Sequence, residues 1–238
     1  MFVPIHGTEF DATRLRNTTM VLPSQCAGLS SHIGMELFIL NNNMQRVGFY
    51  KTDFLAPVVM NDNMTLAGQP MGQISMPAEI WFSEERAMTF LMVRTGPCGG
   101  MRKFADELVA FIMSTDFARV TLLTATTSPV SRERDSNRQL PEVFAYCNNF
   151  MYKNNRNYYN QNGIRRFGYW IQDTKRRPHQ EMAELGASGW ADRLMKSFNR
   201  MEKPAIMFVI FCTGGVDFVG GYNFYEFLSQ DMFGTEAQ

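Results

Sequence analysis

Apolar residues follow two different spacings along the chain, and these spacings predict an alternation of strands and helices. In the first half, strands are predicted over residues 19–22, 46–50, 54–60, 74–82 and 87–94. A polar turn separates the last two, which predicts an antiparallel hairpin. Between the first two strands, Ile33, Leu37, Leu40 and Met44 recur at helical spacing. Ser30 or Ser31 is expected to cap this helix, and the three asparagines after Leu40 are expected to end it.

The second half continues the alternation. Strands are predicted over residues 119–124, 163–171 and 205–212, a short element over residues 142–147, and helices over residues 104–112, 178–201 and 219–232. The run 205–212 contains only apolar residues, which is typical of a central buried strand. Strands that alternate with helices predict an α/β fold. We expect one domain, residues 1–238, built as a three-layer α/β/α sandwich around a mixed, mostly parallel central sheet.

One segment departs from this regularity. Residues 148–162 are rich in asparagine and tyrosine and show no periodic spacing of apolar residues. Such a composition is typical of segments that run over the protein surface. We therefore interpret residues 148–162 as a surface loop or a mobile insertion in the domain.

The composition narrows the class of protein. Of 238 residues, 45% are hydrophobic and 19% charged, which excludes an intrinsically disordered chain. With 23 basic and 23 acidic residues the net charge is zero, so a globally basic nucleic-acid-binding protein is not indicated. No apolar run approaches the roughly 20 residues of a membrane span, and the first residues lack the pattern of a secretory signal. We expect a soluble protein of the cytoplasm and nucleus, without a membrane partner.

Three glycine-rich junctions between a predicted strand and a predicted helix are candidates for ligand binding. They are residues 25–34, 95–100 and 213–221, and free amides at the start of each helix could hold an anion. None has the glycine pattern of a dinucleotide site or a P-loop, so we interpret the glycines as turn formers. An α/β enzyme of the nucleoside-phosphorylase type, with phosphate at these junctions, stays open as an alternative.

The residues that usually carry catalysis are scattered. The chain contains neither a G-x-S-x-G nucleophile motif nor clustered metal ligands. The three histidines, His6, His32 and His179, are far apart in the sequence, and His32 is expected on a helix surface. The cysteines are expected to be buried and reduced; they are Cys26, Cys98, Cys147 and Cys212. The sequence therefore predicts no catalytic residue, no cofactor and no metal site.

The most informative charge pattern lies in residues 132–177. This segment holds ten basic and four acidic residues, a net charge of +6, with nine aromatic residues among them. Tyr, Trp and Arg dominate the energetics of protein interfaces, so we interpret part of the segment as a partner interface. The candidate residues are Tyr158, Tyr159, Arg165, Arg166, Arg176 and Arg177. A solvated strand edge and an RNA-binding module that stacks bases on the aromatics are the alternatives.

A series of segments is informative through its order along the chain. It comprises the opening residues 1–4, the strand 20–23 with the helix 34–40, the segment 47–63 with its VGFY and NDN sequences, the helix and strand 104–124, and the final strand and helix 205–228. In this order the segments resemble the proteasome assembly chaperone family. That resemblance implies an α/β/α fold and a non-catalytic role.

The resemblance also implies partners. A member of the family would pair with proteasome assembly chaperone 1 and act on the α-subunits of the 20S proteasome. The pair would promote formation of the α-ring and prevent aberrant dimerisation of rings. Docking tails of such chaperones end with a tyrosine before the last residue, which residues 234–238 lack. We therefore expect the partner chaperone to provide the docking tail.

Overall fold

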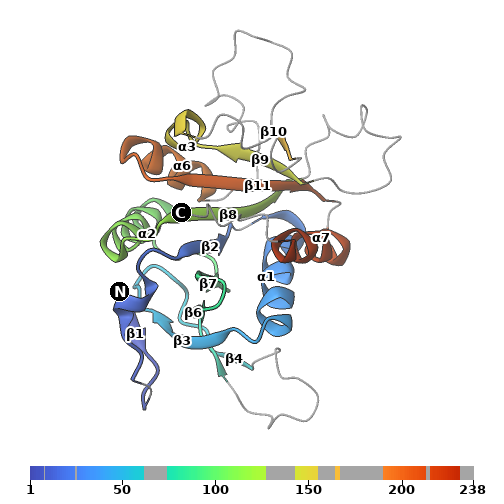
Figure 1. The fold of residues 1–238 in the computed structure, drawn as a ribbon. Helices are drawn as coiled ribbons and strands as arrows, with labels where there is room; N and C mark the ends of the chain where they lie inside the picture. The colour runs from blue at the N-terminus through green and yellow to red at the C-terminus, as the bar shows by residue number, and fades with distance from the viewer. Residues whose placement is uncertain are drawn as a thin grey trace. The chain divides into compact units, whose positions relative to one another are not determined.

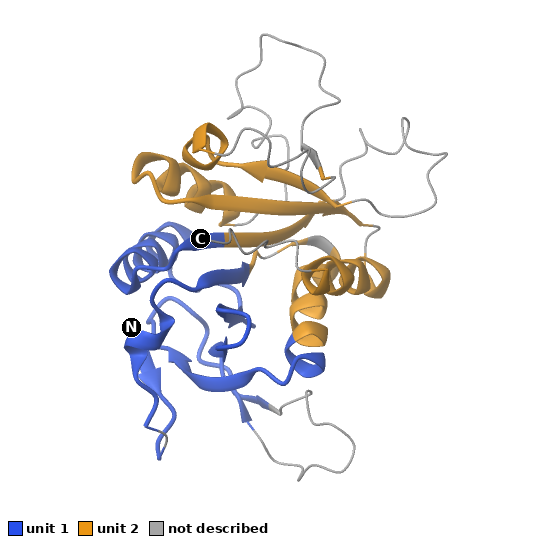
Figure 2. Cartoon of the chain, viewed as in Figure 1, with its two compact units in different colours: residues 1–22, 39–120 blue, residues 23–38, 121–238 orange. Residues whose placement is uncertain are grey.

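The computed structural model describes residues 1–7, 9–24, 26–61, 74–126, 143–154, 164–166, 190–212 and 215–230. The chain divides into two compact units (Figure 2). Unit 1 consists of Met1–Leu22 and Ile39–Val120, and unit 2 of Pro23–Phe38 and Thr121–Gln238. The single domain expected from the sequence remains a prediction, because compactness does not show which segments fold independently.

Unit 1 is built on antiparallel strands and one long helix (Figure 1). Its elements are β1 (Phe2–Pro4), η1 (Ala12–Leu15), β2 (Thr19–Pro23), β3 (Gln45–Tyr50), β4 (Met60–Asn61), β5 (Ile74–Ser75), β6 (Ala78–Ser83), β7 (Met88–Val93) and α2 (Met101–Thr115). The strands of its main sheet follow the order β1-β3-β6-β7-β2. Neighbours are antiparallel from β1 to β7, and β2 runs parallel to β7.

The hairpin predicted from the sequence is confirmed as β6 and β7. Trp81 lies opposite Phe90 in the ladder, and Ala87 in the turn has a left-handed backbone (φ 47°). All six residues of β7 are buried, so this strand forms the centre of the unit's core. Helix α2 buries one face of five residues and ends at Asp116, whose left-handed backbone (φ 61°) terminates the helix.

Unit 2 contains most of the helices. Its elements are η2 (Ala27–Leu29), α1 (Ser30–Asn41, whose last turn belongs to unit 1), β8 (Arg119–Thr126, which starts in unit 1), β9 (Phe144–Cys147), α3 (Asn149–Asn154), β10 (Arg165–Arg166), α6 (Ala191–Arg200), β11 (Ala205–Phe211) and α7 (Phe218–Ser229). The strands follow the order β8-β11-β9-β10. β11 is antiparallel to β9, and β10 is parallel to β9.

The α/β fold with a mixed sheet and packed helices is confirmed. The predicted central strand is β11, whose residues are buried up to Ile210. Helix α6 packs on β11 and buries Trp190, Leu194 and Phe198 at its predicted apolar face. Met201, expected on that face, is 51% exposed because the helix ends one residue before it.

Two predicted elements are different in the structure. Of the strand expected over residues 54–60, only Met60 belongs to a strand, β4, which pairs with β5; Leu55 forms an isolated bridge with Pro97. Pro57 explains the loss, because a proline has no N–H to donate to a ladder. Residues 148–162 were expected to be a loop, but their first part forms α3; residues 155–162 lie outside the described residues.

Two of the four cysteines depart from the expected burial. All four are free thiols, and Cys147 and Cys212 are buried as predicted. Cys98 is exposed and Cys26 is half-buried, so the prediction is wrong for these two. The backbone N–H of Cys98 donates to the carbonyl of Phe54 at 2.7 Å in the loop ahead of α2, which fixes the backbone there and leaves the thiol on the surface. Within the described part of the chain, no helix is both long and apolar enough to cross a membrane.

Candidate protein-binding surface

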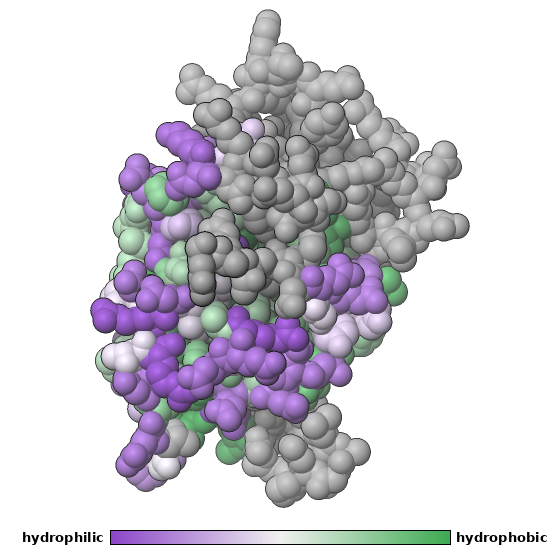
Figure 3. All heavy atoms as spheres, viewed as in Figure 1, coloured by the Kyte–Doolittle hydropathy of each residue, from purple (hydrophilic) through white to green (hydrophobic). Residues whose placement is uncertain are grey.

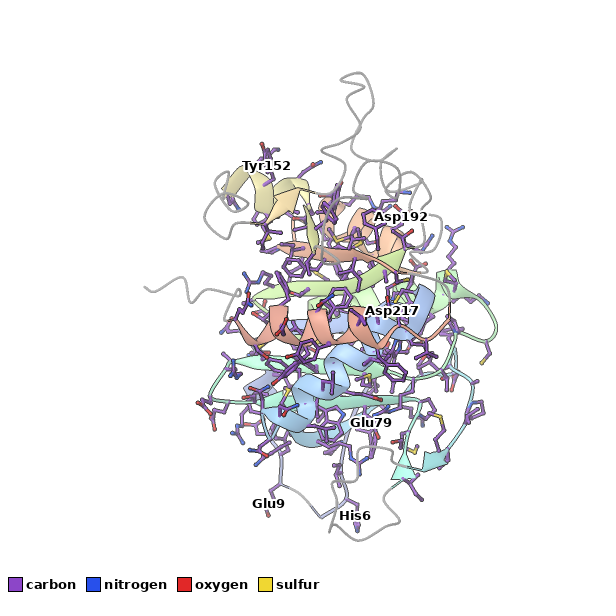
Figure 4. The ribbon with its side chains drawn as sticks, turned by 90° about the vertical axis from the view of Figure 1, so that its right-hand side faces the viewer. His6, Glu9, Glu79, Tyr152, Asp192 and Asp217 are labelled. Atoms are coloured by element: carbon purple, nitrogen blue, oxygen red, sulfur yellow. The ribbon has the colours of Figure 1, made fainter. Side chains whose placement is uncertain are left out.

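Helix α7 begins at a loop that Asp217 fixes in place (Figure 4). The Asp217 carboxylate accepts a hydrogen bond of 2.8 Å from the N–H of Gly220, and its carbonyl accepts one of 3.1 Å from Gly221. In the other direction, the N–H of Asp217 donates to the carbonyl of Gly28 at 2.8 Å. The N-terminal cap of α7 is therefore tied directly to η2, the short helix that precedes α1.

The glycines of this region bring α1 and α7 into close contact. A Cβ atom on Gly34 would lie 2.9 Å from the carbonyl oxygen of Gly221 and even closer to the Cβ of Phe224. A Cβ atom on Gly221 would collide with the side chain of Ile33. The interpretation of these glycines as turn formers is thus wrong for Gly34 and Gly221, which lie inside helices and permit a close approach of backbones. It is correct for Gly28, which has a left-handed backbone (φ 74°).

Beside this packed face, the start of α7, the loop before it and the end of η2 together expose five large hydrophobic side chains. Their exposed fractions are Leu29 49%, Val216 57%, Phe218 70%, Val219 62% and Tyr222 51%, and we call this group the α7 surface. Leu29 and Val216 directly flank the hydrogen bond between Gly28 and Asp217, which holds the two chain segments together. In the view of Figure 3 the described surface is mostly hydrophilic, with hydrophobic residues in small separate patches. Exposed apolar residues that are this close in the chain make the α7 surface a candidate interaction site.

Tyr222 gives the α7 surface a polar edge. A hydrogen bond to Glu226 and the negative charge of that carboxylate raise the pKa of the Tyr222 phenol. The ring of Tyr222 also lies 5.8 Å from that of Tyr225, centroid to centroid, in a tilted arrangement. An aromatic ring with an apolar body and a neutral polar tip suits a protein interface, where tyrosine is enriched.

The interface residues predicted from the basic segment cannot be placed against this surface. Tyr158, Tyr159, Arg176 and Arg177 lie outside the described residues. Arg165 and Arg166 form β10, in parallel register with Phe144 and Ala145 of β9, and nothing is described of their side chains. The hypothesis of an interface at these six residues therefore stays a prediction.

The sequence contained a signal for the α7 surface. The buried residues of the last helix, Phe224, Phe227 and Leu228, follow helical spacing and account for one face. Phe218, Val219 and Tyr222 add large side chains elsewhere on the same helix. A helix that is hydrophobic on more than one face must bury a second face in a core or against a partner.

The described part of the junction ahead of α7 is unsuited to an anion. The start of α7 carries the Asp217 carboxylate, which already accepts the Gly220 N–H that an anion would need and repels negative charge. The junction ahead of α7 therefore does not support the phosphate-binding enzyme that the sequence left open. At the start of α2, Gly100 provides no side-chain cap, and the alternative stays open there.

A thiol, a hydroxyl and an imidazole lie in a row at the start of α1. Ser31 Oγ is 3.1 Å from Cys26 Sγ and 3.4 Å from His32 Nδ1. The hydroxyl donates its proton to the carbonyl of Ser24 at 3.2 Å, so the imidazole is not placed to take it, as activation of a serine requires. His6 is exposed, and His179 lies outside the described residues. Among the described residues, no group of three His, Cys, Asp or Glu side chains could hold a metal ion.

Comparison with known proteins agrees with the resemblance seen in the sequence. No family model matches the chain. Over 129 residues it is 28% identical to human "Proteasome assembly chaperone 2", a match that covers 54% of this chain and 48% of the human protein. The chain thus spans about half the length of the curated relatives it matches. The predicted resemblance to the proteasome assembly chaperones is confirmed as homology over this part.

Solved structures extend the likeness in fold to nearly the whole chain. Pyrococcus furiosus PbaA, described as an archaeal homolog of proteasome-assembly chaperone, has a TM-score of 0.66 and 14% identity over 94% of this chain and 84% of its own. Pyrococcus furiosus PbaB, described as an archaeal proteasome activator, has a TM-score of 0.64 and 12% identity over 100% of this chain and 90% of its own. These similarities establish the fold.

Proposed function

We propose that the chain is a non-catalytic chaperone of 20S proteasome assembly that works by binding other protein subunits. The observation that carries the proposal is the α7 surface, an exposed group of hydrophobic side chains on a helix whose start is fixed by Asp217. Homology to proteins named proteasome assembly chaperone 2 gives that surface its context.

The proposed partner of the α7 surface is proteasome assembly chaperone 1, in a heterodimer of the cytoplasm and nucleus. Permanent interfaces are more hydrophobic than transient ones, and their centres are poor in charged residues. Among the members of the α7 surface, Leu29, Val216, Phe218 and Val219 are apolar and Tyr222 is neutral, which fits a permanent partner better than a transient one. The heterodimer would then bind α-subunits, promote α-ring formation and prevent aberrant dimerisation of α-rings.

Affinity purification from cells tests this proposal. Tagged chain is expected to recover proteasome assembly chaperone 1 and α-subunits, identified by mass spectrometry. The double variant Phe218→Ser and Tyr222→Ser should lose the partner chaperone, because two exposed aromatic side chains of the interface are removed. The variant Met101→Ser, which changes an exposed hydrophobic residue of unit 1, is the matched control and should keep it.

The possible outcomes test the role of the α7 surface and the chaperone function separately. Loss of the partner in the double variant alone supports both the function and the role of α7. Retention of the partner by the double variant would remove α7 from the interface but leave the chaperone function standing. Absence of every proteasome-related protein from the purification of the unchanged chain would contradict the function itself.

A further inference from the structure

A second feature of unit 2 is a shallow, positively charged groove between α3 and α6. The described residues that line it are Asn149 at the start of α3 and four residues of α6, Arg193, Lys196, Asn199 and Arg200. The groove encloses about 500 Å³ and is open to solvent. We call it the α3–α6 groove.

Hydrogen bonds and packing fix the walls of the groove relative to each other. The backbone N–H of Asn149 donates to the side-chain oxygen of Asn199 at 2.7 Å, which joins the start of α3 to α6 (Figure 1). The preceding residue, Asn148, is fully buried and donates from Nδ2 to the carbonyl of Lys203 at 2.7 Å. Leu194 and Phe198 of α6 are both fully buried and anchor this helix in the core. The walls of the groove are therefore in position before a ligand binds.

The groove is positively charged because the basic residues of α6 are spaced so that they lie on the same side of the helix. Arg193, Lys196 and Arg200 are separated by three and four residues, so they lie on one face of the helix. Among the described residues, the lining contains three basic residues and no acidic residue. Asp192, at the edge, forms an ion pair of 2.6 Å with Lys196, so the three basic residues and this carboxylate together carry a net charge of +2.

The arginine at the end of α6 is oriented by a neighbour. Arg200 Nη2 donates to Ser197 Oγ at 3.3 Å, and this contact uses one of its five N–H donors. The others can bind a carboxylate in the bidentate geometry that arginine favours. The side-chain amides of Asn149 and Asn199 add groups of the kind that bind a peptide backbone.

We infer that the α3–α6 groove binds an acidic segment of a partner protein, a short run of Asp and Glu residues. A groove of this volume accommodates a few residues of an extended peptide. Tyr152 on α3 (Figure 4) and Met201 after α6 expose 40% and 51% of their surface next to the lining elements. Tyr, Met and Arg are the residue types enriched at protein interfaces. The inference is independent of the proposed chaperone function, since it rests on the charge and shape of this groove alone.

Fluorescence anisotropy with a short labelled peptide of Asp and Glu tests the inference on the full chain. The double variant Lys196→Glu and Arg200→Glu is expected to bind the peptide at least about tenfold more weakly, because two attractive contacts become repulsive. The matched control is Arg102→Glu with Lys103→Glu, which reverses two exposed charges on α2 of unit 1 and changes the net charge equally. The control should stay within about twofold of the unchanged chain, and thermal unfolding should show that both variants fold.

Each other outcome overturns the inference. Equal weakening in both variants would mean that only the net charge matters. No binding by the unchanged chain at low salt, where charge attraction is strongest, would mean that the groove takes no acidic peptide. Tighter binding of a single-stranded RNA of equal length, abolished by the same double variant, would assign the groove to nucleic acid instead.

Discussion

The backbone N–H of Asp217 donates a hydrogen bond of 2.8 Å to the carbonyl oxygen of Gly28, across almost two hundred residues of sequence. The bond joins η2, the short helix before α1, to the loop before α7. Because the Asp217 side chain also caps α7, this one residue fixes both the first residue of the helix and its connection to η2. The geometry of the apolar α7 surface therefore depends on the hydrogen bonds of a polar residue.

Substitution Asp217→Ala should weaken partner binding and lower the stability modestly. Loss of an N-cap costs about 1 kcal/mol in the free energy of unfolding, since the N–H of Gly220 loses its acceptor. The first turn of α7, which carries Phe218 and Val219, then frays. Urea unfolding gives the stability, and co-purification with the partner gives the binding. Asp217→Ser retains a cap acceptor and should restore most of both; equal damage by Ser and Ala would contradict a capping role.

Substitution Gly34→Ala should destabilise the protein, although helix propensity alone favours it. Alanine is better than glycine in a helix by about 1 kcal/mol. Here the new Cβ would meet the backbone of Gly221 and the Cβ of Phe224, and backbone atoms cannot move aside as a flexible side chain can. Overpacking of this kind costs about 1–3 kcal/mol. The measurement is the change in the free energy of unfolding, which we expect to be destabilising. A more stable variant would show that α1 and α7 move apart easily to accommodate the new Cβ atom.

Substitution Asn148→Ala should cost about 2–3 kcal/mol in unfolding free energy. The Asn148 side chain donates to Lys203 and accepts from the N–H groups of Met151 at 3.0 Å and Ala205 at 3.4 Å, so its loss leaves buried backbone groups without partners. Asn154→Ala, at the exposed end of the same helix, is the control and should change the stability by less than about 0.5 kcal/mol. Similar small effects of both changes would show that α3 is held by other contacts.

The stability of the protein should fall above the ordinary tyrosine pKa of about 10. Burial, and then the charge and hydrogen bond of Glu107, raise the pKa of the Tyr50 phenol. The folded state keeps this proton while the unfolded state loses it, so the contribution is complete below about pH 10 and decreases as the pH rises beyond it. Urea unfolding between about pH 9 and pH 11 measures the loss. Tyr50→Phe should show a flatter profile over this range, and parallel profiles would refute the assignment.

Local pattern was sufficient for most elements of the fold. The β6–β7 hairpin, helix α2 and strand β11 follow from the spacing of apolar residues and from turn residues, which act over a few positions. Contacts between distant segments were not accessible in the same way. The fully buried Glu79 is an example: its carboxylate lies 2.9 Å from Arg46 of the neighbouring strand β3 and 3.4 Å from Arg94, the residue that follows β7. From the sequence alone, a glutamate in a strand is predicted to be exposed, because the basic residues that would pair with it are not known.

The candidate site was predictable to a smaller extent. The sequence predicts the glycines at residues 34 and 221 as turn formers, but their role is to leave out a side chain where two helices pack closely. That role depends on which helix is the neighbour, which one sequence does not specify. The excess of aromatic residues on the last helix was visible, but its meaning required the buried face to be known first.

Leu29 has a left-handed backbone (φ 54°) and exposes half of its side chain to water. For an isolated chain both properties are unfavourable, because a residue with a Cβ resists this conformation and an apolar side chain gains nothing in solvent. Glycine would remove the steric conflict, and a polar residue would remove the exposed apolar area. A leucine at this position thus lowers the stability of the isolated chain and provides an apolar side chain for contact with a partner. It is a compromise between stability and activity at a single residue.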